Sequence, residues 1–212
     1  MEILAHRGYW REQEERNSME SLIRALDNGF GIETDIRDYN GKLVISHDIA
    51  NSNSSSVEIL FKYYKEQGLA SSLALNVKSD GIQPLLKPLI EKYNIHNYFL
   101  FDMSVPELVV NNREKLKYFT RHSDIEHQCV MYHSADGVWM DSFYDNRWLS
   151  KEMIREHIKD GKKICVVSSE LHGNSYEGVW KMIKDEGFHK SEFLKLCTDI
   201  PQEAKRYFRY ED

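Results

Sequence analysis

Two carboxylates lie two residues apart in the run Gly-Ile-Glu-Thr-Asp-Ile at residues 31–36. If this run is a β-strand, Glu33 and Asp35 point to the same face, because successive side chains of a strand alternate. Two carboxylates this close repel each other unless a cation lies between them. Mg²⁺ and Ca²⁺ prefer such oxygen ligands, and Mn²⁺ accepts them as well. The pair therefore predicts a divalent-metal site.

Two histidines, His6 and His47, flank this pair in the sequence. Histidine has an unperturbed pKa of about 6.5, so two of them can act as general base and general acid at neutral pH. Arg7 offers a planar fork for a phosphate group, and Lys78 offers a point charge. A metal, two proton-transfer groups and two cations suit displacement at phosphorus. Each residue taken alone has an ordinary structural interpretation, and the hypothesis depends on their occurring together.

The elements that must position these residues alternate between short β-rich runs and segments with helical periodicity. The sequence predicts strands at residues 2–6, 31–36, 73–78, 98–102, 116–121, 137–141, 163–168 and 194–198, with a hairpin strand at 42–46 after the turn Asn40-Gly41. It predicts helices at residues 18–28, 57–67, 82–93, 105–114, 151–159, 176–186 and 202–208. Ser150 and Ser175 are expected as N-caps, and residues 51–56 as a loop tip.

Eight strands that alternate with helices are compatible with a closed barrel or an open doubly wound sheet. Eight is the number that closes a barrel, and the first turn, His6 to Trp10, lacks the glycine-rich sequence of a nucleotide-binding sheet. We therefore expect an α/β protein, a single compact (β/α)8 TIM barrel whose one domain covers residues 1–212. Its reactive groups should follow the carboxyl ends of the strands, where the sequence places His6, Arg7, Glu33, Asp35, Asn76, Lys78 and Asp102.

Composition excludes several classes of protein. The net charge of −6 over 212 residues argues against a nonspecific nucleic-acid binder. No apolar run approaches the roughly 20 residues that span a bilayer. The first residues lack the pattern of a secretory signal, so a cytoplasmic location is expected. The three cysteines, Cys129, Cys165 and Cys197, share no metal-ligand spacing, and the last two are expected to be buried, unreactive thiols.

The first 48 residues also resemble the glycerophosphodiester phosphodiesterase family, which lies within the phospholipase-C-like barrel superfamily. The motifs that carry the resemblance are His6-Arg7-Gly8, Asn17-Ser18 before a helix that ends at Gly29, Glu33-x-Asp35, Asn40-Gly41 and Val44 to Asp48. The resemblance implies that His6 and His47 form the acid–base pair. It further implies that Glu33 and Asp35 bind the metal and that Arg7 contacts phosphate.

The chain departs from the family pattern at two positions. Arg16 stands where the family usually has an active-site glutamate, unless Glu14 or Glu15 reaches in. Asn76-Val77-Lys78 replaces the usual Glu-x-Lys, so Asn76 is expected as a metal ligand that brings no charge. Either metal affinity falls or a neighbouring acid such as Asp102 compensates. The short segment after His47 leaves the expected site open. The motifs Gly29 to Glu33, Asn76 to Gly81 and Ser169 to His172 resemble a bacterial branch of the superfamily, and this resemblance implies a setting in glycan metabolism.

These observations predict metal-dependent hydrolysis of a phosphodiester, either glycerophosphodiester-like, within lipid metabolism, or glycan-linked. The expected cofactor is Mg²⁺ or Ca²⁺, with Mn²⁺ possible, and the expected partner is a small-molecule or glycan substrate rather than a nucleic acid. Two alternatives remain open: a lyase of the superfamily that releases a cyclic phosphate, and a barrel that binds phosphodiesters but has weakened or lost turnover.

Overall fold

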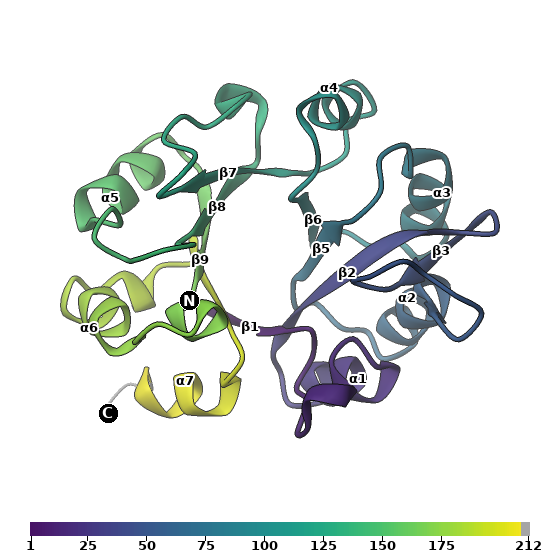
Figure 1. Cartoon of the computed structure of the whole chain (residues 1–212), viewed down its shortest axis with the longest axis horizontal. Coiled ribbons are helices and arrows are strands. Elements are labelled where there is room, and N and C mark those ends of the chain that lie inside the picture. Colours follow the sequence, from purple (N-terminus) through teal and green to yellow (C-terminus); the bar gives the residue numbers. More distant parts are fainter. Residues whose placement is uncertain (209–212) are drawn as a thin grey trace. The chain divides into compact units, whose positions relative to one another are not determined.

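The computed structural model describes residues 1–208 (Figure 1). The chain divides into two compact units, one of residues 6–118 and one of residues 1–5 with the residues from 119 onward. No helix among residues 1–208 is long and apolar enough to cross a membrane. The single domain predicted over residues 1–212 stays a prediction, and its last four residues lie outside the described ones.

The unit of residues 6–118 is built on three parallel strands, β2, β5 and β6, and β2 continues into an antiparallel hairpin with β3 (Figure 1). The short strand β4 pairs with β3. The strands are β2 (Gly31–Tyr39), β3 (Lys42–Ile45), β4 (Ser55–Ser56), β5 (Leu73–Val77) and β6 (Tyr98–Phe101), and the helices are α1 (Met19–Asp27), α2 (Val57–Glu66), α3 (Gln83–Tyr93) and α4 (Val105–Arg113). A 3₁₀ turn, η1 (Gln13–Glu15), precedes α1.

The first six residues of β2 are buried on both faces of the sheet, as expected for a parallel strand. One face carries Ile32, Thr34 and Ile36, and the other carries Glu33 and Asp35. The parallel register places Asp35 opposite Asn76 of β5. Two polar positions on one strand and one on its neighbour therefore meet on the same face.

The unit of residues 1–5 and 119 onward contains five parallel strands in the order β1-β10-β9-β8-β7. The strands are β1 (Glu2–His6), β7 (Phe119–Ser123), β8 (Gly137–Asp141), β9 (Lys163–Val167) and β10 (Leu194–Thr198). The helices are α5 (Lys151–Lys159), α6 (Glu177–Asp185) and α7 (Pro201–Tyr207), with 3₁₀ turns η2 (Tyr132–Ser134), η3 (Ser169–His172) and η4 (Phe188–Lys190). Its core is apolar, and Trp180 is fully buried among branched side chains of β8, β9 and β10.

Most predicted elements are confirmed with small differences at their ends, and three expectations are wrong. The strand expected at 116–121 is β7 instead, shifted toward the carboxyl end, and Tyr118 makes only a single bridge to Leu100. Ser55 and Ser56 belong to β4 rather than to a loop tip, and the Ser56 hydroxyl accepts from the Glu58 amide to cap α2. Ser175 does not cap α6, because its hydroxyl bonds to the Glu177 carboxylate instead.

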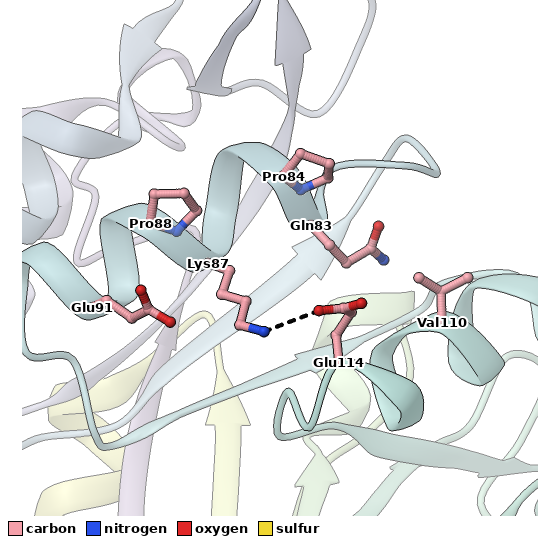
Figure 2. A pocket seen from close by; sticks show the side chains of 7 residues that line it. All are labelled: Gln83, Pro84, Lys87, Pro88, Glu91, Val110 and Glu114. Carbon is pink, nitrogen blue, oxygen red and sulfur yellow. Dashed lines mark hydrogen bonds and ion pairs between the residues drawn. The ribbon is translucent and has the colours of Figure 1, made fainter.

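A hollow of about 360 Å³ lies between α3 and the carboxyl end of α4 (Figure 2). Pro84, Lys87 and Pro88 line it from α3, and the ion pair of Lys87 with Glu114, 2.9 Å from nitrogen to oxygen, spans it. None of the residues with predicted chemistry lines this hollow. It is a gap between helices that an ion pair bridges.

The loop that follows β1 requires glycine at position 8. Arg7 has a φ of 55° and Gly8 a φ of 89°, so the chain turns sharply toward α1. The Tyr9 amide then donates to the Ser21 carbonyl at 2.9 Å. A Cβ on Gly8 would lie 2.5 Å from the Ser21 hydroxyl oxygen and 2.7 Å from its carbonyl carbon. The loop therefore approaches the helix too closely for any side chain at this position.

Replacement of Gly8 by alanine should lower the free energy of unfolding by roughly 2–4 kcal/mol, because strain at positive φ adds to a backbone clash. Gly29→Ala is the matched control, since Gly29 has a φ of 76° but no atom within 4 Å of the added carbon. That control should cost about 1 kcal/mol. Urea denaturation measures both. Equal losses in the two variants would show that the contact with Ser21 does not constrain the loop.

Candidate active site

Most of the predicted site residues come together on one face of the sheet within residues 6–118. Glu33 and Asp35 on β2 are 1% and 0% exposed, and Asn76 on β5 is 7% exposed. Lys78 follows β5, and its amide donates to the Ile36 carbonyl at 2.9 Å, which continues the β2–β5 register. The chain enters this unit at His6 and Arg7, which reach the same carboxylates. Buried carboxylates are rare in proteins unless cations accompany them.

Asp35 lies between two cations. Its Oδ2 is 3.3 Å from Arg7 Nε, and its Oδ1 is 3.2 Å from Lys78 Nζ. Asn17 donates its amide hydrogen to Oδ2 at 2.7 Å, while its carbonyl oxygen accepts from the Thr34 hydroxyl at 2.8 Å. These contacts offset the cost of burying the Asp35 charge. Arg7 and Lys78 are therefore held where a phosphate bound beside Asp35 would meet both.

Glu33 has less compensation than Asp35. The Arg7 amide donates to its Oε2 at 3.1 Å, and His6 Nε2 lies 3.8 Å from the same oxygen. Burial first, and the Asp35 charge second, raise the pKa of Glu33 from 4.5 to about 7, although His6, Arg7 and Lys78 oppose the shift. The nearby cations therefore do not fully compensate the negative charge of an ionised Glu33. A divalent cation next to it would supply the missing positive charge.

Two oxygen atoms in the site are buried and accept no hydrogen bond: Asp35 Oδ1 and Asn76 Oδ1. The Lys78 ammonium is close to the first oxygen but is not aligned with it as a hydrogen-bond donor. Asn76 donates its amide hydrogen to Asp102 Oδ2 at 3.1 Å, so its oxygen is left as the free acceptor. Unsatisfied buried oxygens beside a carboxylate of raised pKa fit a hard divalent cation. Glu33, Asp35 and Asn76 together form an oxygen donor set for such a cation.

His47 lies at the end of the β2–β3 hairpin and is the most exposed of the predicted residues. The Ser46 amide donates to the Asp35 carbonyl at 3.0 Å, which ties this end of the hairpin to β2. The His47 Nδ1 atom is 2.8 Å from Asp48 Oδ1, and its side chain is 45% exposed. The hydrogen bond to His47 lowers the pKa of Asp48, and the Arg7 and Arg37 charges add to the effect. Within the described residues, His47 therefore pairs with Asp48 and not with Glu33 or Asp35.

The expected glutamate substitute near Arg16 is not found at Glu15. The Glu15 carboxylate lies 2.7 Å from Arg24 Nη1 and accepts a hydrogen bond from the Arg11 amide at 2.9 Å. It therefore stabilises the loop before α1. The Arg16 guanidinium lies 4.5 Å from the centre of the Trp10 ring. Trp10 in turn donates its indole hydrogen to the His6 carbonyl at 3.1 Å. An arginine stacked on an aromatic ring thus occupies the position at which the family resemblance implies a glutamate.

Asn17 and Asp102 contribute to the site in ways that the sequence did not specify. Asn17 was singled out only as the start of a helix, yet its side chain bridges Thr34 and Asp35. Asp102 lies beside Asn76 and accepts a hydrogen bond from the amide nitrogen of that residue. Both have positive φ, 59° and 64°, in loops next to strands of the site. Asparagine and aspartate tolerate that conformation better than most residues, which was the available signal.

The raised pKa of Glu33 predicts a pH dependence of stability in metal-free protein. Between pH 4.5 and about 7 the folded state holds a proton on Glu33 that the unfolded chain has lost. The free energy of unfolding should therefore fall as pH rises through this range. Urea denaturation in chelator at pH 4.5–8 measures it, and Glu33→Gln should show a shallower fall. Parallel profiles for the two proteins would contradict the assignment.

Divalent metal should reverse this trend, because its ligands must be deprotonated. Added Mg²⁺ or Ca²⁺ should stabilise the protein more at pH 8 than at pH 5.5. The same addition should have little effect on Glu33→Gln at either pH.

Solved structures of glycerophosphodiester phosphodiesterases resemble this chain over nearly its whole length. A candidate enzyme of this kind from Galdieria sulphuraria has 19% sequence identity and a TM-score of 0.76, and the match covers 98% of this chain and 97% of that one. A glycerophosphodiester phosphodiesterase from Parabacteroides distasonis has 17% identity and a TM-score of 0.69, with 98% and 96% covered. A phosphodiesterase from Oleispira antarctica, solved with the product sn-glycerol-3-phosphate, has 15% identity and a TM-score of 0.66, with 98% and 96% covered.

No protein-family model matches the sequence, and a search of curated proteins found no match. At these identities the structural likeness concerns the fold. The predicted fold class is confirmed: the chain has an α/β fold with a mostly parallel sheet that matches the TIM-barrel structures of glycerophosphodiester phosphodiesterases.

Proposed function

We propose that this protein is a metal-dependent phosphodiesterase that hydrolyses a glycerophosphodiester-like or glycan-linked substrate. The observation that carries the proposal is the buried pair Glu33 and Asp35, whose site contains unsatisfied oxygens and two cations that can receive a phosphate. The fold shared with glycerophosphodiester phosphodiesterases supports it. So does the product, sn-glycerol-3-phosphate, in the structure of the Oleispira antarctica phosphodiesterase.

Glu33, Asp35 and Asn76 would hold the divalent cation, Mg²⁺, Ca²⁺ or Mn²⁺. When bound, the cation supplies Lewis-acid stabilisation of the negative charge that develops on the phosphate. Asn76 contributes a neutral oxygen, and Asp102 keeps that oxygen available by accepting the amide hydrogen of Asn76. The donor set is thus two carboxylates and one amide, with a third acid adjacent.

Arg7 and Lys78 would bind the nonbridging oxygens of the phosphate. Both already lie within 3.3 Å of Asp35, so they are placed before substrate arrives. Arginine can offer two parallel hydrogen bonds to one phosphate, and lysine a single charged donor. Groups positioned in advance stabilise developing charge without having to reorganise.

His6 and His47 would move the proton. One takes it from the attacking hydroxyl as the new bond to phosphorus forms, and the other donates a proton to the leaving oxygen as the old ester bond breaks. Asp48 engages Nδ1 of His47, which leaves Nε2 as the atom for proton transfer. In a glycerol diester the nucleophile can be the substrate's own hydroxyl, which gives a cyclic phosphate that water then opens. Either histidine can act first in this scheme.

Two alternatives remain, and a specific observation favours the second. A superfamily lyase would stop at the cyclic phosphate, and phosphorus NMR of the product separates it from a hydrolase. A binding protein without turnover is favoured by Arg16 and Asn76, which replace two acids expected from the family resemblance. Such a protein would bind phosphodiesters in a titration and leave them intact with every metal.

Replacement of His47 by alanine should lower turnover by about 10²–10⁴-fold, because it removes one proton-transfer group. The test is hydrolysis of glycerophosphocholine, glycerophosphoethanolamine, sugar phosphodiesters and a chromogenic bis-ester, with Mg²⁺, Ca²⁺ or Mn²⁺ and with chelator. The His47 side chain is about half exposed, so the melting temperature should change little.

His96→Ala is the matched control, because His96 is an exposed histidine of the same unit that precedes β6 at its amino end. It should retain full turnover. Metal-dependent hydrolysis that survives in His47→Ala would exclude His47 from the reaction. Folded protein that binds the diesters but cleaves none would favour the binding-protein alternative.

A further inference from the structure

A second cluster of metal-binding side chains lies in the unit formed by residues 1–5 and 119 onward. His122 belongs to β7, His157 to α5, and Cys129 to the segment between β7 and η2. One ligand atom of each lies within 4.8 Å of the others, and His122 Nδ1 is 3.1 Å from His157 Nε2. Both histidines are buried and Cys129 is half-buried. Three side chains from three segments thus converge below the surface.

Neighbouring side chains fix the orientation of His157. The Tyr132 hydroxyl lies 2.9 Å from His157 Nδ1 and donates to Asp160 Oδ2 at 3.0 Å. Nδ1 is therefore engaged, and Nε2 is directed at His122. The Trp148 ring packs against His122 with the ring centres 5.1 Å apart. A histidine whose second nitrogen is held through a tyrosine and a carboxylate has the arrangement that supports metal ligands in other proteins.

We propose that His122 Nδ1, His157 Nε2 and Cys129 Sγ bind one Zn²⁺ ion. Two imidazoles and a thiolate are the ligands that zinc prefers, whereas Mg²⁺ and Ca²⁺ require oxygen. The fourth position of a tetrahedral ion is left for water. This zinc site is separate in sequence and chemistry from the oxygen site of Glu33 and Asp35, and it does not depend on phosphodiesterase activity.

The observed distances suit a zinc ion with a small adjustment. Zinc binds nitrogen at about 2.0–2.1 Å and sulfur at about 2.3 Å, so tetrahedral ligand atoms lie roughly 3.5 Å apart. The two nitrogens are already near that separation, and the sulfur, which lies within 4.8 Å of both, must close a gap of no more than about 1.3 Å. Cys129 lies in a segment without helix or strand, which can accommodate this movement.

The protonation states of the three groups are compatible with binding. Burial is the main reason that the pKa of His122 is lowered and that of His157 falls to about 4, so both imidazoles are neutral and can donate a lone pair. Burial raises the pKa of the Cys129 thiol to about 11, and the thiol is therefore protonated without a cation. A coordinated zinc ion deprotonates such a thiol, and its proton is released to solvent.

The alternative is a purely hydrogen-bonded chain from Asp160 through Tyr132 and His157 to His122. Such a chain satisfies both ring nitrogens of His157 and Nδ1 of His122, but it does not involve Cys129. The cysteine therefore distinguishes the two interpretations. If zinc binds, it links the 124–131 segment to α5; if not, Cys129 only packs against the nearby core.

Titration of metal-free, full-length protein with Co²⁺ tests the proposal, since Co²⁺ reports its ligands by absorption. One equivalent should give the visible bands of a tetrahedral ion and a sulfur-to-cobalt charge-transfer band in the near ultraviolet. One equivalent of Zn²⁺ should abolish both and raise the melting temperature. Tyr132→Phe should retain the bands and weaken zinc binding by about 10-fold, because it removes an outer hydrogen bond.

Cys129→Ser should lose the charge-transfer band and bind zinc about 100-fold or more weakly. Cys197→Ala, at a buried cysteine of β10, and Glu33→Gln, in the oxygen site, should both retain the band. Circular dichroism of metal-free Cys129→Ser verifies its folding, and His157→Gln serves as a second ligand variant. The proposal is overturned if wild-type protein shows no charge-transfer band, if the band survives in folded Cys129→Ser, or if His157→Gln binds Zn²⁺ as tightly as wild type.

Discussion

The candidate active site depends on the burial of two carboxylates side by side. Burial removes Glu33 and Asp35 from water, and the desolvation cost of two ionised carboxylates is too high unless positive charge surrounds them. The surroundings of the pair reflect this constraint: Arg7 and Lys78 reach Asp35 from two different strand ends, and the Arg7 amide reaches Glu33. Even so, Glu33 is left with a pKa near neutrality. A protein gains little stability from such an arrangement, which favours a binding role for the pair.

The loops around the pair are shaped by the same requirement. Arg7 can contact both carboxylates because the backbone turns at positive φ through Arg7 and Gly8 and rests directly on α1. Asn17, also at positive φ, fills the space between α1 and β2 and donates to Asp35. Local strain in this loop is therefore tied to the placement of functional groups rather than to the packing of the core.

The sequence was sufficient to predict the features that depend on neighbouring residues in the chain, such as strand alternation and turns. Alternation within a strand was enough to place Glu33 and Asp35 on one face, and the turn residues Asn40 and Gly41 were enough to place the hairpin. Long-range contacts were harder. The shift of the strand near Phe119 depends on its pairing with β8, and the short strand at Ser55 and Ser56 depends on its pairing with β3; neither pairing leaves a local signal.

The cluster of His122, Cys129 and His157 shows the same limit more clearly. Its ligands are separated by irregular intervals, and Cys129 has no second cysteine at a metal-ligand spacing. Only the packing of α5 against the neighbouring strands brings the two histidines together. The role of Asn17 was hidden for a related reason, since an asparagine before a helix is usually a cap. Residues that act through tertiary contacts cannot be found from spacing alone.

Asn76, at the position where the family resemblance implies a glutamate, affects the charge of the candidate site and hence the order in which ligands would bind. With Glu33, Asp35 and Asp102 all ionised, and Arg7 and Lys78 positive, the site without metal has a net charge of about −1, and protonation of Glu33 brings it to about 0. A divalent cation changes the net charge of the ionised site to about +1. An anionic diester is repelled by the ionised site without metal and attracted by the site with metal. Under the proposed function, metal should therefore bind before substrate, and the charge of the cation would control whether an anionic diester can bind.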